Sequence, residues 1–308
     1  MLFNGDMDDG REEVPGPSKK DLEIAYAYHE MGEKGKGEEK ETEALDRLEE
    51  LWESGKKEER EETVDPVTGL PLVDTVEEKV LASLAYIKDI PKKLDNRVIW
   101  SVLVMDGNHF KEINDNLTHG HGDDFLKGQA DGIRRSLREQ DLVYRSSGGG
   151  DEIMVLLRHS VDKEKRGDKK KRGRKRDVRE SVENEIIPRI VNENEVHRER
   201  FVDGLDGEKQ KMAEAVGFLS KGVGTLAMGI RHYTVGELKE LIEKWEGLDE
   251  NKRGEKGFLR KYLLEDADVG QMMAKTVGKL PEGVARNFAV AVRPDGEYRV
   301  LESVCKLD

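Results

Sequence analysis

The chain has 308 residues, a net charge of −13, and a composition in which 39% of residues are charged. Its one cysteine, Cys305, excludes a disulfide within the chain and is typical of proteins from a reducing compartment. No stretch approaches the roughly 18 apolar residues that a membrane span needs, and the acidic start lacks the regions of a secretory signal. We therefore expect a cytoplasmic protein, and its acidity argues against general nucleic-acid binding.

The first 62 residues differ in composition from the rest of the chain. Residues 1–17 contain few apolar side chains and predict a disordered tail. Residues 18–62 predict an acidic helical extension, because apolar side chains recur there at helical spacing. This apolar stripe has two interpretations, which are packing on its own domain and a dimerising coiled-coil stalk.

Beyond this extension the pattern is that of an α/β domain. Turn residues fill 65–71, and a helix is predicted to follow them. An almost continuous apolar run at 98–105 ends at Asp106 and predicts a central strand that is buried on both faces. An acid at the end of such a strand is a common place for a ligand site. Two helices are predicted next, at 110–116 and 123–138.

A glycine-rich stretch, SGGGDE at 147–152, follows these helices. It stands between two apolar, β-branched runs at 141–145 and 153–157, which predicts a β-hairpin with a tight glycine-rich turn. A role in packing would not explain why two acids, Asp151 and Glu152, stand next to each other after the glycines. They suit a metal held against phosphate oxygens.

A highly charged insertion runs from about residue 158 to 215. Within it, residues 163–179 contain 11 bases and 3 acids. One interpretation is a solvated surface loop, within which residues 178–191 are compatible with a helix despite Pro188. The other is an anion-binding patch, and charge complementarity favours the acidic N-terminal segment as its occupant. After the insertion we predict a strand, two helices and a closing hairpin, at 223–230, 235–247, 258–278 and 287–301.

Three acids stand out as a set: Asp106, Asp151 and Glu152. If the strand before Asp106 neighbours the hairpin, these carboxylates converge and repel one another unless they are protonated or bridged by a cation. Mg²⁺ is the favoured cation because it prefers oxygen ligands and substrate phosphates, and Mn²⁺ is the alternative. Three histidines within 109–121 also suggest zinc, but no cysteine or acid pattern completes a tetrahedral site.

Five motifs in order resemble those of the GGDEF family, the diguanylate cyclases. They read DPVTGLP at 65–71, DGNHFKEIND at 106–115, HGHGDDFL at 119–126, GGDEI at 149–153, and a late AD, AK and GK block at 267–279. The similarity covers roughly residues 63–160 and 216–293. It implies that residues 63–308 form a catalytic domain of α/β (α+β, palm-like) class. Its central mixed or antiparallel sheet would be flanked by helices, as in nucleotidyl cyclases.

The resemblance implies condensation of two GTP molecules to cyclic di-GMP and pyrophosphate across a homodimer. It assigns Asp106, Asp151 and the Gly107 carbonyl to metal binding, and Asp151 and Glu152 to catalysis. The positions that it assigns to substrate binding, of which the first two read the guanine edge, are Asn114, Asp123, Lys111, Gly149, Gly150, Lys275 and Lys279.

Arg138 and Asp141 match the family's Arg-x-x-Asp inhibitory site, where the product binds, although an ordinary charge pair at a helix end would look the same. Other positions depart from the family: Asn108 replaces an acid, and two residues are inserted before Gly149. These departures favour a second interpretation, a catalytically inactive GGDEF-like module that binds GTP or cyclic di-GMP as a regulator. The retained acids favour the enzyme.

Overall fold

A computed structural model describes most of the chain beyond the acidic extension. The residues described are 64–73, 76–77, 80–81, 87–146, 150–159, 178–249, 257–278 and 285–301. The predicted tail and helical extension (1–62), most of the basic stretch, and its proposed contact with the N-terminal segment lie outside these residues. No helix in the described ranges is long and apolar enough to cross a membrane.

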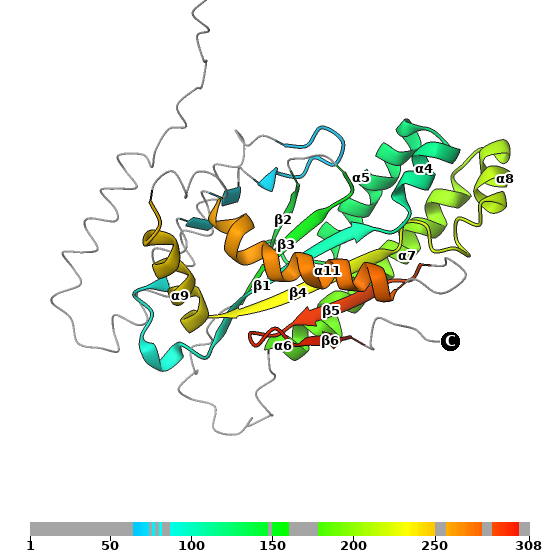
Figure 1. Ribbon diagram of the computed structural model, residues 1–308. Helices are drawn as coiled ribbons and strands as arrows, with labels where there is room; N and C mark the ends of the chain where they lie inside the picture. Colours follow the sequence, from blue (N-terminus) through cyan, green and yellow to red (C-terminus); the bar gives the residue numbers. More distant parts are fainter. Residues whose placement is uncertain are drawn as a thin grey trace, which may run out of the picture. The chain divides into compact units, whose positions relative to one another are not determined.

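A six-stranded mixed sheet forms the centre of the domain (Figure 1). Its strands are β1 (Val98–Gly107), β2 (Leu142–Arg145), β3 (Ile153–Arg158), β4 (Leu226–Thr234), β5 (Phe288–Val292) and β6 (Tyr298–Val300). Their order across the sheet is β2-β3-β1-β4-β5-β6, and every neighbouring pair is antiparallel except the parallel pair of β4 and β5. This arrangement confirms the predicted fold class, and the pairing of β5 with β6 confirms the closing hairpin.

Helices cover both faces of the sheet (Figure 1). The α-helices are α4 (Phe110–Asn116), α5 (His119–Arg135), α6 (Val178–Ser181), α7 (Ile187–Asp203), α8 (Gly207–Ala215), α9 (Val235–Glu246) and α11 (Glu265–Val277). The other helical segments are the 3₁₀ turn η2 (Lys92–Leu94) and the π-helical η3 (Val182–Ile186) and η4 (Leu259–Leu264).

The central strand β1 divides its side chains between two hydrophobic cores. Val102 and Val104 pack with residues of α9 and α11 on one face, and Leu103 and Met105 pack with residues of α5 and α7 on the other. From Ile99 onward every residue of β1 is buried, as its near-continuous apolar sequence predicts.

Helix α11 lies directly against β4 because Gly229 has no side chain. A Cβ at Gly229 would overlap the carbonyl oxygen of Ala267, and a Cβ at Gly270 would in turn lie 2.9 Å from Val292. This close approach of helix and sheet brings α11 within reach of the end of β1.

Residues 178–215 of the charged insertion form α6, η3, α7 and α8, so the interpretation as a surface loop is wrong there. The helical pattern at 178–191 is confirmed, since it falls on α6, η3 and the start of α7. Apolar residues of these segments, among them Ile187 and Ile190, are fully buried against the sheet. The helix predicted at 123–138 also begins earlier, at His119, because the Thr118 side chain accepts a hydrogen bond from the His121 backbone and caps it.

A buried polar network joins three strands at the opposite end of β1 from Asp106. Ser101 Oγ lies 2.7 Å from His159 Nε2 and 2.7 Å from His232 Nδ1. One hydroxyl has a single proton to donate, so at least one of the two imidazoles must donate its own N–H to the oxygen. Burial, and to a lesser extent His232, lowers the pKa of His159 to about 3.

We predict that this network makes the domain less stable as the pH falls. Folded His159 stays neutral well below pH 6.5, whereas the unfolded chain takes up a proton there, so the free energy of unfolding decreases from about pH 6.5 downward. At pH 5 the loss from this residue is about 1–2 kcal/mol. Urea denaturation between pH 8 and 5 should show a flatter profile for His159→Gln than for the wild type. His119→Gln, at an exposed position, should keep the wild-type slope.

Candidate functional site

The pairing of β1 with β3 brings the predicted acids together. Met105 lies opposite Ile153 in this antiparallel ladder, so Asp106, which follows Met105 in β1, comes next to Glu152, which directly precedes β3. Asp106 is only 7% exposed. The Asp151 carboxylate lies against Gly107, where a Cβ would be 3.0 Å from Asp151 Oδ2. The absence of a side chain at Gly107 therefore makes room for the second carboxylate.

A lysine from α11 completes this acidic group. Lys275 Nζ lies 2.6 Å from Asp106 Oδ1. The ammonium and the carboxylate are separated by 169 positions in sequence. They meet because α11 lies so close to β4.

Neighbouring charges and burial make the carboxylates here hard to ionise. Burial and the charge of Asp106 raise the pKa of Asp151 to about 6. The same two causes raise the pKa of Glu152 and that of Asp268 in the first turn of α11. Sequence analysis did not assign Asp268, although it stands in the late family motif. The site therefore has an excess of negative charge that a proton or a cation would relieve.

The donor set fits a hard divalent cation. Asp106 and Asp151 offer paired carboxylate oxygens, which are the ligands that Mg²⁺ prefers. Within the described ranges, no group of three or more His, Cys, Asp and Glu side chains gathers where it could hold a metal ion. A cation at the pair would thus need further oxygens from the backbone, a substrate or water.

The signature hairpin is longer at its tip than expected. The ladder of β2 and β3 runs without a register shift to the pair Arg145–Ile153, which leaves the seven residues 146–152 as the connection. The prediction of a tight turn is therefore wrong, because the two inserted residues lie in this loop and not in the ladder. Gly150 has φ +97°, a conformation that glycine adopts without strain. Gly149 lies outside the described residues.

A buried arginine that the sequence analysis did not single out holds this loop. Arg145 Nη1 lies 2.5 Å from Asp65 Oδ2, and its Nη2 donates to the Gly150 carbonyl. Asp65 also accepts hydrogen bonds of 2.7 Å from the backbone and hydroxyl of Thr68. The turn at 65–71 is thereby tied to the loop that carries Asp151. The pairing of a buried acid with a distant arginine has no local sequence signal.

The residues predicted to contact guanine lie on α4 and α5. The Asn114 amide packs against Gly122, where a Cβ would overlap Asn114 Oδ1. The next residue of α5, Asp123, is exposed, and so is Lys111 on α4. The structure thus brings Asn114 close to the start of α5, whereas Lys111 points to solvent. Lys279 lies outside the described residues.

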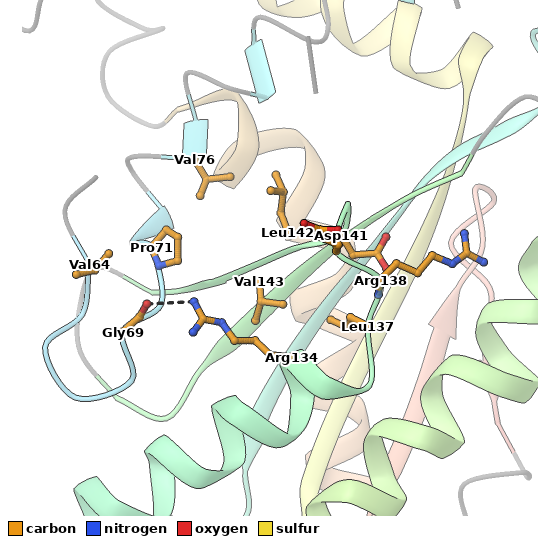
Figure 2. Close-up of a pocket in the computed structure, with 11 residues that line it drawn as sticks. Val64, Gly69, Pro71, Val76, Arg134, Leu137, Arg138, Asp141, Leu142 and Val143 are labelled. Atoms are coloured by element: carbon orange, nitrogen blue, oxygen red, sulfur yellow. Dashed lines mark hydrogen bonds between the residues drawn. The ribbon is translucent and has the colours of Figure 1, made fainter. Parts of the chain in front are cut away.

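A separate cavity contains the predicted inhibitory residues (Figure 2). Its volume is about 360 Å³, and Arg134, Arg138 and Asp141 line it. Asp141 Oδ2 accepts a 2.9 Å hydrogen bond from the Arg138 backbone, so the carboxylate is fixed at the cavity wall. Arg134 Nη2 donates to the Gly69 carbonyl across the cavity, as Figure 2 shows.

Asn108, which replaces an acid of the family, is buried between hydrogen-bond acceptors. Its Nδ2 donates to Thr225 Oγ1 at 3.1 Å and to the Arg286 carbonyl at 3.3 Å. Thr225 Oγ1 already donates its proton to the Gly222 carbonyl, so it acts as an acceptor toward Asn108. Only an amide can supply both bonds, which explains the asparagine.

Comparison with known proteins agrees with this geometry. A family model described as "Diguanylate cyclase, GGDEF domain" matches residues 63–192. The diguanylate cyclase TpbB of Pseudomonas aeruginosa is 51% identical over 63 residues, which are 20% of this chain and 14% of TpbB. Residues 63–192 of this chain are therefore similar to the GGDEF domain. The diguanylate cyclase DgcP of the same species is 34% identical over 93 residues, 30% of this chain and 13% of DgcP.

Another relative has a different activity in its name. The cyclic di-GMP phosphodiesterase NbdA of P. aeruginosa is 44% identical over 64 residues, 21% of this chain and 8% of NbdA. The matched segment therefore spans only a small part of each of these curated relatives.

Solved GGDEF structures were also compared with this chain. The GGDEF domain of P. aeruginosa TpbB is 25% identical, with a TM-score of 0.41, and the match covers 70% of this chain and 90% of that one. Caulobacter crescentus DgcB in complex with c-di-GMP is 17% identical, with a TM-score of 0.44, and the match covers 83% and 95%. Because both TM-scores are below 0.5, the family assignment depends on the family model and the sequence relatives.

We predict that Asn108→Asp, which introduces the acid found in the similar family, destabilises this domain. The carboxylate cannot donate to Thr225 or to the Arg286 carbonyl, and it would be buried against both acceptors. The expected loss in the free energy of unfolding is about 1–3 kcal/mol, measured by urea denaturation at pH 8. The same change at exposed Asn192 is the control. Equal stability of the two variants would contradict the hydrogen-bond assignment.

We also predict that Asp151→Asn stabilises the metal-free domain. The folded pKa of Asp151 is above its unfolded value, so its ionisation costs stability as the pH rises from about 4 to 6 and above. Removing that charge should raise the free energy of unfolding by about 1–2 kcal/mol at pH 8 in EDTA, and the gain should vanish near pH 4. Asp124→Asn, at an exposed position of α5, should change neither value. A gain that does not depend on pH would refute the charge argument.

Proposed function

We propose that this chain is a diguanylate cyclase that condenses two GTP molecules to cyclic di-GMP and two pyrophosphates across a homodimer. The observation that carries the proposal is the convergence of Asp106 and Asp151 from neighbouring strands, with Lys275 beside them. Such a group can bind a polyphosphate and take up a proton from an attacking hydroxyl.

In this reaction each 3′-oxygen attacks the α-phosphorus of the GTP held by the other subunit. The bond between the α-phosphorus and its bridging oxygen to the β-phosphate breaks, and pyrophosphate leaves with that oxygen. The proton of the attacking hydroxyl passes to a carboxylate oxygen of Asp151. In the metal-free site, burial and Asp106 raise the pKa of Asp151 to about 6. Glu152 stands beside it and adds negative charge to the same region.

GGDEF cyclases are generally metal-dependent, and we propose that Asp106, Asp151 and the Gly107 carbonyl hold the ion. Mg²⁺ is the preferred ion, with Mn²⁺ as the alternative, because the donors are hard oxygens. When bound, such an ion would neutralise phosphate charge. Lys275 would then be free to turn from Asp106 to the phosphates, since the ion takes over the neutralisation of that carboxylate.

Guanine recognition is proposed for Asn114 and Asp123. The amide can both donate and accept, and the carboxylate accepts, which matches the donor and acceptor edge of guanine. Lys111, Gly149, Gly150 and Lys279 complete the proposed substrate contacts.

The cavity with Arg138 and Asp141 is proposed as a product site. Arginine pairs with phosphate or with the guanine O6 and N7 atoms in a bidentate manner, and a fixed carboxylate accepts from the guanine N–H groups. Arg134 adds a second guanidinium to the same cavity. Cyclic di-GMP bound there would restrain the turn at 65–71 through the Arg134 contact with Gly69.

A second candidate function is a regulatory module that binds GTP or cyclic di-GMP without turnover. The seven-residue loop favours it, because a longer tip holds Asp151 less firmly and an error of about 1 Å costs about 10²-fold in rate. The relative NbdA, named as a phosphodiesterase, gives this alternative further support.

Turnover with GTP distinguishes the two candidates. The full chain, incubated with GTP and Mg²⁺ and analysed by nucleotide chromatography, should yield cyclic di-GMP and pyrophosphate in a 1:2 ratio. Asp151→Asn should reduce the rate by about 10²–10⁴-fold, as expected when a proton acceptor is removed. Asp124→Asn should leave the rate unchanged. Bound GTP without any cyclic product, even at high protein concentration, would establish the regulatory module instead.

A further inference from the structure

Helix α7 directs a row of buried polar side chains at the loop that precedes β4. Asn194 is 2% exposed and Arg198 is 3% exposed, one helical turn apart on the same face of α7. Gln129 of α5, equally buried, lies beside them and donates a 2.9 Å hydrogen bond to Asn194 Oδ1. Burying three polar side chains costs free energy unless each forms hydrogen bonds. Their hydrogen-bond partners therefore indicate which part of the structure they support.

The partners are backbone carbonyls of this loop. The Gly224 carbonyl accepts from Asn194 Nδ2 at 3.0 Å and from Gln129 Nε2 at 3.3 Å. The Val223 carbonyl accepts from Arg198 Nε at 2.8 Å. Two successive peptide groups are therefore held from the side of α7.

The other side of the loop holds the turn after β1. The Gly224 N–H donates to the Asn108 carbonyl at 2.7 Å, and the Asn108 N–H donates to the Thr225 carbonyl at 2.7 Å. Asn108 follows Asp106 and Gly107 directly. The Gly224 residue thus links α7 to the turn that carries the proposed metal-binding groups.

The loop cannot easily change its position or its sequence. Gly224 has φ +75°, in the region that favours glycine, and a Cβ there would overlap the ring of Phe125. That ring packs in turn against Phe201 of α7, with ring centroids 5.1 Å apart. The hydrogen bonds from α7 and the apolar contact with α5 fix the same peptide.

We propose that Asn194 and Arg198 are positioning residues for the turn at Asp106, and that they act through the backbone of Val223 and Gly224. The assignment depends on the proposed function, because it takes Asp106 and Gly107 as the groups that must be placed. Helix α7 then has a defined part in the site, although it is distant from it in sequence and makes no contact with the carboxylates themselves.

The test removes one hydrogen-bond donor without changing the shape of the side chain. Asn194→Asp keeps the acceptor for Gln129 but presents a carboxylate to the Gly224 carbonyl in place of an amide donor. Asn192→Asp makes the same substitution at an exposed position of the same helix and is the matched control. Both variants are compared with the wild-type full chain.

The first readout is amide hydrogen exchange of peptides spanning 104–112 and 220–226, which needs no catalytic activity. In Asn194→Asp we expect exchange at the Asn108 and Gly224 amides to be at least about 10-fold faster, since local opening no longer breaks a bond to α7. The control should match the wild type. Wild-type exchange in folded Asn194→Asp would overturn the proposal.

The second readout separates positioning from general stability. Because the guanine contacts are proposed on α4 and α5, the dissociation constant for guanosine, which has no phosphates to reach the turn at Asp106, should stay within about 2-fold, while kcat with GTP falls about 10–100-fold. An equal loss of guanosine binding and kcat would indicate a structural role only and would refute positioning.

A second variant covers the chance that Asn194→Asp does not fold. Arg198→Lys keeps the charge but loses the guanidinium N–H that reaches the Val223 carbonyl, and the same two outcomes apply to it. If the wild type has no cyclase activity, the proposed function fails, whereas the exchange measurement still decides whether α7 holds the turn.

Discussion

The repulsion between two carboxylates at the end of one strand pair is the constraint on which the rest of this domain depends. Antiparallel pairing of β1 with β3 brings Asp106 at the end of β1 close to Asp151 in the loop before β3. A structure optimised for stability alone would avoid this arrangement, because burial makes each charge more costly. The ammonium group of Lys275 on α11 offsets this repulsion. Lys275 reaches the carboxylates because Gly229 of β4 has no side chain and lets α11 lie close to the sheet.

The two helical layers support the site in different ways. On one face, α11 supplies charge, through Lys275 near the carboxylates and Asp268 in its first turn. On the other face, α7 and α5 supply backbone anchors through Asn194, Arg198 and Gln129. Electrostatic balance and mechanical support therefore come from opposite sides of the sheet. A preorganised site needs both, since charged groups help a reaction only when they are held in place.

The sequence predicts those parts of the domain whose signals are local. Periodicity and turn residues within a few positions of one another are enough to predict the apolar run of β1, the acids at strand ends and the closing hairpin. The strand ends of the signature hairpin were predicted to within one residue, but the connection was predicted as a tight turn because its glycine-rich composition is typical of short turns. The helices beyond residue 191 and the burial of Ile187 and Ile190 were not predicted, because high charge conceals so narrow an apolar stripe. The contacts of Arg145 and Lys275 join residues 80 and 169 positions apart, which no local pattern reveals.

The late position of α11 in the chain has a consequence for how the domain is assembled. During synthesis β1, β2 and β3 leave the ribosome more than 100 residues before Lys275 does. Their hairpin can pair early, because closing a short loop costs little entropy. The carboxylates of Asp106 and Asp151 then face each other without their lysine until β4 has joined β1 and α11 has docked on it. The repulsion between Asp106 and Asp151 can thus form before the lysine that offsets it has been synthesised.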